Sequence, residues 1–342
     1  MSDKTTIAMK RRHISTTLFL FIALLFSCKE APPVFQHDLP SSNQPWTKSQ
    51  FDNDSEKFSF IVHSDLTGGE RPRIYDVAVE QMNLLRPEFI VNVGDLIEGG
   101  KPDSTSWIGQ WDEFDERANK AKAPVFYTGG NHDLTGNFAH GIWEKRYGRS
   151  YYHFLYKNTL FLVLDSDDHG SIRNDEIEKM RNEGIRILEE EGEEAYAKTD
   201  YANLPERSYG NMSEEQRDYF LEVLQKYPDV KWTFLMMHKP MWDSPQNERF
   251  AALEERLTGK NYTVFNGHTH TFNYQVRKGM DYINLATTGG AQNNSRGRSM
   301  DHFLWITVDN EGISIANLLM EGILNRQGFI PAGGDTLVFE KK

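Results

Sequence analysis

Cysteine is almost absent from this 342-residue chain, in which Cys28 stands alone. A single cysteine cannot pair within the chain, so no internal disulfide holds the fold. Positive charge is scarce as well: 38 Lys and Arg residues oppose 50 Asp and Glu residues, and the net charge is −12. An acidic surface repels polyanions, so nucleic acid is not an expected partner. The charged and apolar fractions, 26% and 38%, are those of a soluble folded protein.

Long hydrophobic runs are also missing, apart from one between about Ile14 and Phe26 that follows the basic Lys10-Arg11-Arg12. This arrangement is typical of a secretory signal, and the run is too short to span a bilayer comfortably. Cys28 follows the small residue Ser27 and resembles the acceptor cysteine of a bacterial lipoprotein signal. That resemblance implies removal of residues 1–27, a membrane-anchoring lipid on Cys28, and export to the periplasm or cell envelope. An uncleaved membrane anchor and ordinary cleavage nearby are the alternatives.

The composition changes along the chain and predicts four segments. Residues 1–27 form the signal, and residues 28–57, rich in Pro, Ser, Asn and Asp, form a flexible tether. Residues 58–320 form the folded domain, with an acidic, partly helical and solvated insertion at about 170–211. Residues 321–342 form a C-terminal extension.

Strands and helices alternate in the first part of the folded domain. A compact apolar strand at Phe58–His63 is followed by helical spacing from Ile74 to Leu85 and by a second strand at Phe89–Val93. A helix is predicted next, at about Trp111–Lys122, before a strand that ends near Tyr127. This order indicates a β-α-β unit whose parallel strands end at one edge of a sheet.

The later strands are predicted from apolar runs and alternation, and a capping box at Ser213 predicts a helix to about Gln225. Strands are expected at Tyr151–Tyr156, Thr159–Leu164, Trp232–Met237 and Tyr262–Phe265. The last three, Tyr282–Ala286, Phe303–Val308 and Ile313–Leu318, are expected to be antiparallel additions to a second sheet.

Polar motifs follow several of these strands. They are Asp65, Gly94-Asp95, Gly129-Gly130-Asn131-His132-Asp133, His238 and Gly267-His268-Thr269-His270. Carboxylate, amide and imidazole groups are the ligands that divalent transition-type metals take, and open positions on the ion bind water and substrate. Each motif alone is weak, since a lone Gly-Asp is usually a turn and a single His is usually structural. Their joint occurrence indicates a metal site.

In order and local wording these motifs closely resemble the calcineurin-like metallophosphoesterases, whose pattern runs Asp-x-His, Gly-Asp, Gly-Asn-His-Asp/Glu, a lone His, and Gly-His-x-His. The resemblance extends roughly from Phe58 to Asn317, and four of the five blocks are intact. It implies a four-layer α/β/β/α sandwich of two mixed sheets, with helices outside and metals at the strand ends. It also implies metal-dependent hydrolysis of a phosphoester.

The resemblance further assigns roles to positions of this sequence. Two divalent ions, Mn, Fe or Zn, are implied, with Asp95 bridging them. The second ion is completed by Asn131, His238 and His268, and the first by Asp65 and His270. His132 faces the substrate, where it stabilises phosphoryl oxygens or protonates the leaving group, and Asp133 orients His132 through a hydrogen bond. A hydroxide held between the ions attacks phosphorus, without a covalent phosphoenzyme.

One block departs from the family pattern, because Thr67 stands where the family has His. A hydroxyl is a far poorer metal ligand than an imidazole, so the first ion is expected to bind weakly, with Thr67 or water filling the gap. His63 lies deeper on the same strand and is interpreted as a core residue. His169, after the strand ending at Asp165, is either a substrate or metal contact or a simple loop residue.

Two rival functions remain at this point. The first is a cyclic-nucleotide or other phosphodiesterase with the same site, since the family includes enzymes for monoesters and diesters. The second is a non-catalytic surface lipoprotein that kept the fold, for which Thr67 is the only support. The retained His132 and the complete second set of ligands argue against this reading.

Overall fold

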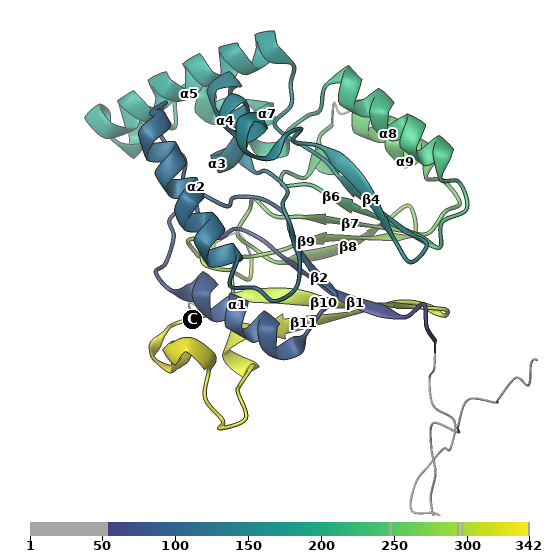
Figure 1. The fold of residues 1–342 in the computed structure, drawn as a ribbon. Coiled ribbons are helices and arrows are strands. Elements are labelled where there is room, and N and C mark those ends of the chain that lie inside the picture. Colours follow the sequence, from purple (N-terminus) through teal and green to yellow (C-terminus); the bar gives the residue numbers. More distant parts are fainter. Residues whose placement is uncertain (1–53, 246–247, 293, 296, 341–342) are drawn as a thin grey trace, which may run out of the picture. The chain divides into compact units, whose positions relative to one another are not determined.

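The structure is a computed structural model that describes residues 54–340 except 246–247, 293 and 296. The predicted signal, Cys28 and most of the predicted tether lie outside the described residues. The described chain forms two packed sheets with helices on their outer faces (Figure 1). The predicted fold class, a four-layer sandwich with two mixed sheets, is confirmed.

The first sheet has the strand order β11-β10-β1-β2-β3. Strands β1, β2 and β3 are parallel, β10 pairs antiparallel with β1, and β11 pairs antiparallel with β10. The bounds are β1 (Phe58–His63), β2 (Phe89–Asn92), β3 (Val125–Phe126), β10 (His302–Asp309) and β11 (Gly312–Leu319). The parallel strands thus end at one edge, as the β-α-β pattern predicts.

The second sheet has the order β4-β5-β6-β7-β9-β8. Strands β5, β6, β7 and β9 are parallel, whereas β4 and β8 are antiparallel edges. The bounds are β4 (Tyr152–Tyr156), β5 (Thr159–Val163), β6 (Trp232–Met236), β7 (Tyr262–Asn266), β8 (Asn273–Arg277) and β9 (Met280–Asn284).

The prediction that the last three strands add antiparallel to the second sheet is wrong. Strand β9 does join that sheet, but β8 and β9 form a hairpin that lays β9 parallel to β7. Strands β10 and β11 belong to the first sheet, where Phe60 of β1 faces Ile306 of β10. Alternation identifies a strand and its buried face, but it carries no information about the neighbouring strand.

Helices α1 (Ile74–Leu85), α2 (Ser104–Ala118) and α4 (Asn137–Tyr147) pack on the first sheet through a core that includes Val77, Trp111 and Trp143. Helix α2 begins earlier than the sequence pattern indicates because the Asp103 side chain caps it by accepting from Thr105 N at 3.0 Å. Helices α8 (Glu214–Lys226) and α9 (Glu248–Arg256) cover the second sheet through a core that includes Phe220.

The acidic insertion contains α5 (Ser171–Glu191), α6 (Glu193–Tyr196) and α7 (Pro205–Tyr209). Helix α5 contacts α4, and Arg181 donates to the Gly100 carbonyl at 2.9 Å, so the insertion borders the loop after β2. Within the described part of the chain, no helix combines the length and apolar character needed to cross a membrane.

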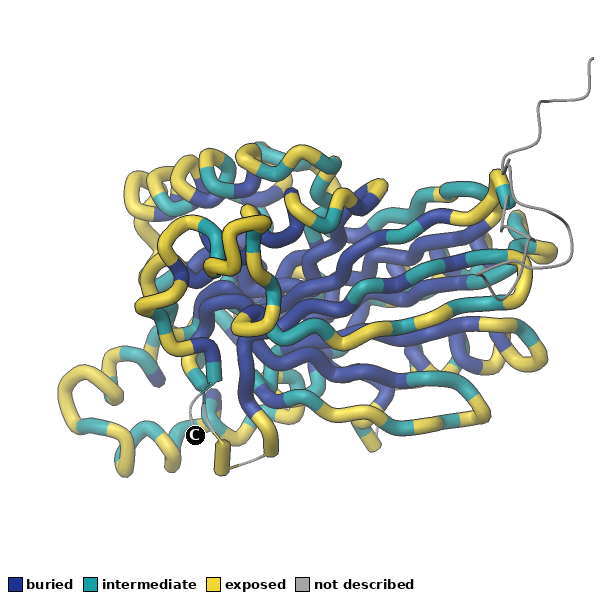
Figure 2. Tube along the Cα trace, turned by 90° about the horizontal axis from the view of Figure 1, so that it is seen from below, coloured by how far each residue is buried: buried dark blue, intermediate teal, exposed yellow. Residues whose placement is uncertain are grey.

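A third core fills the space between the sheets. The ring of Phe60 lies edge-on to those of Phe161 and Phe234, at centroid distances of 5.2 and 5.0 Å. Each such aromatic pair contributes about 0.5–1.5 kcal/mol beyond its buried area. Figure 2 shows the strand centres buried and the outer helices and loops largely exposed. This packing fixes the distance between the sheets and therefore between their loops.

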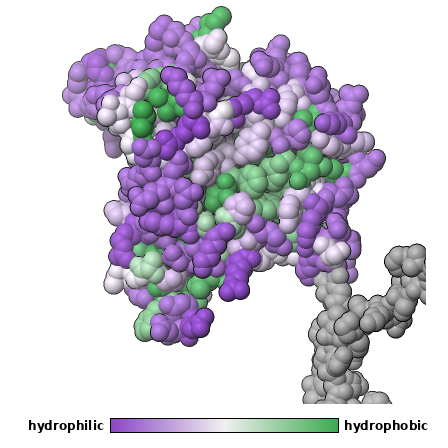
Figure 3. All heavy atoms as spheres, in the orientation of Figure 1, coloured by the Kyte–Doolittle hydropathy of each residue, from purple (hydrophilic) through white to green (hydrophobic). Residues whose placement is uncertain are grey.

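The face seen in Figure 3 is mostly hydrophilic, and its broadest hydrophobic area crosses the middle, where the sheet edges lie in this view. The edge strands β3 and β4 meet through Phe126 and Phe154, whose rings stack with centroids 4.1 Å apart. The two sheets are therefore joined at their edges as well as in the core.

Candidate metal centre

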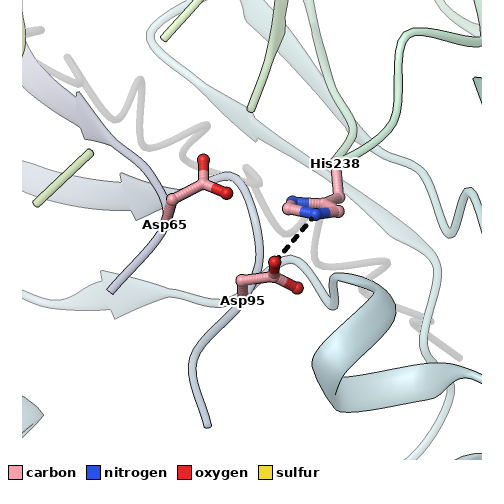
Figure 4. Close-up of side chains that lie close together, drawn as sticks. All are labelled: Asp65, Asp95 and His238. Atoms are coloured by element: carbon pink, nitrogen blue, oxygen red, sulfur yellow. Dashed lines mark ion pairs between the residues drawn. The ribbon is translucent and has the colours of Figure 1, made fainter. Parts of the chain in front are cut away.

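Two carboxylates and one imidazole meet where the carboxyl ends of β1, β2 and β6 come together. Asp65, Asp95 and His238 each offer a ligand atom, and these atoms all lie within 4.8 Å of one another (Figure 4). All three side chains are buried. Oxygen and nitrogen donors at this spacing fit a divalent transition-type ion.

His238 faces two other predicted ligands with the same nitrogen. Its Nε2 lies 3.2 Å from Oδ2 of Asp95 and 3.1 Å from Oδ1 of Asn131. Its Nδ1–H donates to the carbonyl of Val93 at 3.0 Å, and a carbonyl can only accept. The backbone thus fixes the ring so that Nε2 is the atom offered to a cation.

His270 and Asp65 repeat this arrangement. Nε2 of His270 lies 3.2 Å from Oδ1 of Asp65, and its Nδ1–H donates to the carbonyl of Ala291 at 2.5 Å. The backbone N–H of His268 donates to both oxygens of Asp65 at 3.2 Å, and the His268 ring lies 5.2 Å from that of His238. The six residues predicted as ligands therefore lie together.

In the pairs His238–Asp95 and His270–Asp65, the carboxylate favours a positive charge on the neighbouring imidazole. Burial opposes the charged imidazole, but the Asp95 carboxylate raises the pKa of His238 to about 9, and Asp65 does the same for His270. Burial likewise opposes ionisation of Asp95, yet His238 and His132 hold its pKa below the usual range. A divalent cation would supply the positive charge that the imidazole protons supply in these pairs.

The backbone is strained at four of the predicted ligands. Asp65, Asp95, His268 and His270 have φ of 50°, 58°, 75° and 56°, in the left-handed region that non-glycine residues rarely adopt. Such conformations cost of order 1–3 kcal/mol each and cluster at functional sites. Here they aim four side chains from the ends of three strands at one place.

The glycines of the motifs permit close approach. A Cβ on Gly94 would collide with the ring of His238, and one on Gly130 would collide with Oδ1 of Asp95. Larger residues at either position would push a predicted ligand away from the centre.

His132 is the most accessible of the predicted catalytic residues, with 28% of its side chain exposed. It lies in the single-turn helix α3 (Asn131–Leu134), and its backbone N–H donates to Oδ1 of Asp95 at 3.0 Å. Its Nδ1–H donates to the carbonyl of Glu98 at 2.7 Å, so Nε2 is the atom available to a substrate.

The prediction that Asp133 accepts a hydrogen bond from the His132 ring and so orients it is wrong. Asp133 is fully buried and accepts from the backbone N–H groups of Gly130, Leu96 and Ile97 at 2.8, 3.0 and 3.0 Å. Consecutive residues in a helical turn do not face each other, so the two side chains point to different partners. Asp133 instead joins α3 to the Asp95 loop, and burial together with Asp95 raises its pKa to about 8.

The two remaining predicted contacts are Thr67 and His169. Thr67 is 2% exposed, and its hydroxyl donates to the carbonyl of Ile97 at 2.7 Å, which links the loops that carry Asp65 and Asp95. The backbone N–H of His169 donates to Asn174 at 3.1 Å. The His169 ring lies near the charges of Asp167, which follows β5, and Lys239, which follows β6.

Sequence reasoning missed two ion pairs beside the centre, one buried and one partly buried. Lys239 Nζ lies 2.6 Å from Asp167, with both side chains at most 4% exposed, and His140 Nε2 lies 2.9 Å from Asp165. The signal was present, because Asp165 and Asp167 follow the buried strand β5 just as Asp65 follows β1. Lys239 directly follows His238.

Comparison with solved structures gives the same fold. The chain is similar to a dimetal phosphatase from Danio rerio, with 13% identity, a TM-score of 0.51, and coverage of 77% of this chain and 98% of that one. It is also similar to a purple acid phosphatase from yellow lupin (Lupinus luteus) seeds, with 12% identity, a TM-score of 0.51, and coverage of 78% and 52%. At such identities the likeness shows the fold alone. No curated protein matches the chain.

The family is shown by the sequence match. Residues 58–272, more than half of the chain, match the family model described as calcineurin-like phosphoesterase. That range includes every predicted ligand from Asp65 to His270. The chain belongs to the calcineurin-like phosphoesterase family and is a metal-dependent phosphoester hydrolase.

Proposed function

We propose that this hydrolase works with two divalent ions and that Asp95 would be a ligand of both. Asn131, His238 and His268 would hold the second ion, and Asp65 and His270 would hold the first. The observation that carries this assignment is the convergence of two carboxylate–imidazole pairs, each with its imidazole Nδ1–H fixed by a backbone carbonyl. Two such pairs side by side provide donors for two ions.

The first site is the weaker of the two in this proposal. Thr67 replaces the imidazole that the family pattern has at this position, and its hydroxyl proton is engaged by the Ile97 carbonyl. Asp65, Asp95 and His270 then hold the first ion with fewer protein donors than the second. Fewer donors predict faster exchange of the first ion.

The chain contributes charge, orientation and a proton. When bound, the ions supply positive charge for the phosphoryl oxygens and lower the pKa of water. The buried carboxylates of Asp65 and Asp95 offset the charge of the ions. His132, with Nδ1–H held by Glu98, presents Nε2 to the substrate, where it binds a phosphoryl oxygen or gives a proton to the leaving group.

The test is reconstitution of the full chain with manganese, iron or zinc, followed by assay on a generic phosphomonoester and a generic phosphodiester. Hydrolysis of either ester, lowered about 10²- to 10⁴-fold by His132→Ala, supports the proposal. If neither ester is hydrolysed with any of the metals and His132→Ala changes nothing, a metal-binding surface protein replaces the enzyme. The ratio of the two rates assigns the ester class.

We also propose that the enzyme acts outside the cytoplasm, tethered by a lipid on Cys28. The support is the sequence of residues 10–28 described above. Growth with a labelled fatty-acid analogue should label the wild-type protein and leave Cys28→Ser unlabelled. Equal labelling of both proteins would contradict the tether.

A further inference from the structure

Glu98 joins three segments that surround the candidate centre. It follows Asp95 by three residues, in the loop between β2 and α2. Its carbonyl accepts the Nδ1–H of His132 at 2.7 Å. Its carboxylate reaches the loop after β1, where Oε1 accepts from the N–H groups of Gly69 and Glu70 at 2.9 and 2.7 Å, and Oε2 accepts from Gly68 at 3.2 Å.

The loop after β1 is shaped to receive a carboxylate. Gly68 and Gly69 have φ of 76° and 88°, which turns successive N–H groups toward one side. Consecutive N–H groups of this kind form a concavity that binds anions. Hydrogen bonds to an ionised carboxylate are shorter and stronger than those between neutral groups. Glu98 therefore helps to order this glycine-rich segment. The bond from the Ala291 N–H to the Gly68 carbonyl at 3.3 Å and the ion pair between Glu70 and Arg117 hold it as well.

The Gly68–Glu70 loop lies against the imidazoles of His270 and His132. A Cβ placed on Gly68 would lie 3.0 Å from Nε2 of His270 and 3.5 Å from Nε2 of His132. The Gly68 backbone thus lies beside the nitrogen proposed to hold the first ion and beside the nitrogen proposed to meet the substrate. A movement of this loop changes the space in which a phosphoryl group is held between them.

We propose that Glu98 is a positioning residue, which sets the distance between the Gly68–Glu70 loop and the His132 imidazole. This rests on the proposed role of His132. The Glu98 carboxylate binds the Gly68–Glu70 loop, and the Glu98 carbonyl binds the His132 ring that faces this loop. The Thr67 hydroxyl holds the base of the β1 loop through Ile97, whereas the Glu98 carboxylate accepts from the three N–H groups of residues 68–70.

The expected kinetic effect of Glu98→Ala follows from displacement of the Gly68–Glu70 loop relative to His132. Removing the carboxylate leaves three N–H groups to water and loosens the loop, while the Glu98 carbonyl still holds the His132 ring. A displacement of about 1 Å at a reacting centre costs roughly 10²-fold in rate. We therefore expect kcat of Glu98→Ala to fall about 10- to 100-fold, with KM changed far less.

Glu98→Gln removes the charge and keeps part of the geometry. Its amide oxygen can still accept from the N–H groups of Gly69 and Glu70, but its amide nitrogen cannot accept from Gly68. We expect Glu98→Gln to recover most of kcat through these bonds. Its pH profile reports separately on the carboxylate charge, because Oε2 of Glu98 lies 3.8 Å from Nδ1 of His132. The matched control is Glu189→Ala, which removes an exposed glutamate whose ion pair with Lys101 lies on the surface. It should behave as the wild type.

The experiment uses the full chain loaded with Mn²⁺, and it combines kcat, KM, metal content and amide hydrogen exchange at Gly68, Gly69 and Glu70. Support requires three results: a lower kcat for Glu98→Ala at unchanged metal content, faster exchange at these amides, and rescue of both by Glu98→Gln. Wild-type kcat in Glu98→Ala would overturn the proposal. So would loss of metal in step with activity, or a Glu98→Gln variant as slow as Glu98→Ala with a shifted pH profile.

Failure of the proposed function remains distinguishable from failure of this inference. If the wild type hydrolyses no ester, the proposed function fails, but hydrogen exchange still reports whether Glu98 orders the loop. Unchanged exchange in Glu98→Ala overturns the inference whatever the activity.

Discussion

Nε2 of His238 lies 3.2 Å from Oδ2 of Asp95, although the two residues follow strands of different sheets. Asp95 follows β2 of the first sheet, and His238 follows β6 of the second. Asp65 and His270 repeat this relationship after β1 and β7, also at 3.2 Å. The candidate centre therefore forms only when the two sheets pack so that the carboxyl ends of β1, β2, β6 and β7 lie side by side.

Metal removal should lower stability, because ions bound between the sheets add contacts that only the folded chain offers. At a free ion concentration 100 times Kd, one site adds about 3 kcal/mol to the free energy of unfolding. Thermal unfolding of the metal-loaded and chelator-treated protein measures this difference. Equal Tm values would show that no ion bridges the sheets.

Asp95→Asn should remove activity more completely than any other ligand substitution, because Asp95 is proposed to serve both ions. Loss of several kcal/mol of charge stabilisation corresponds to a fall in kcat/KM of about 10³-fold or more. Metal analysis should show fewer than one ion per chain. Asp112→Asn, at an exposed carboxylate paired with Arg146, is the control and should retain activity.

Thr67→His should tighten the first site, because an imidazole is a better metal ligand than a hydroxyl. Metal titration should show higher occupancy at limiting metal than in the wild type. Thr67→Val is the control: it keeps the shape, loses the bond to Ile97, and should cost about 1–2 kcal/mol of stability without raising metal affinity. Unchanged stoichiometry and affinity in Thr67→His would mean that another group already fills the place.

Stability should fall at alkaline pH through the His140–Asp165 pair. Burial opposes the charged imidazole, but the Asp165 carboxylate raises the pKa of His140 from 6.5 to about 9. Because the folded-state pKa lies above the unfolded one, the contribution is complete below pH 6.5 and is lost as pH rises through 9. The shift corresponds to about 3 kcal/mol.

Urea unfolding of the metal-loaded protein between pH 6.5 and 9.5 measures this loss, and His140→Gln provides the comparison. The wild type should lose more stability than the variant over this interval. Parallel pH dependences would show that the pair is not charged in the folded protein.

The fold class was accessible from the sequence because strand–helix alternation and the order of the motifs repeat a known pattern. Strand β1 was predicted with its observed bounds, since Phe58–His63 is a compact apolar run that ends at polar residues. Strand β8 was missed because it is a five-residue edge strand whose two apolar side chains, Tyr274 and Val276, are exposed and add nothing to the core. The sheet to which β10 and β11 belong was also out of reach, because pairing depends on residues far away in the chain.

The sequence by itself determined which residues stand at strand ends, because side-chain periodicity and glycine positions are local properties. It therefore named Asp65, Asp95, His238 and His270 as one group. Only the tertiary structure decided what each side chain touches: Asp133 holds backbone N–H groups instead of His132, and the Glu98 carboxylate reaches a loop after another strand. These contacts join segments that meet only when the two sheets pack, so no local pattern encodes them.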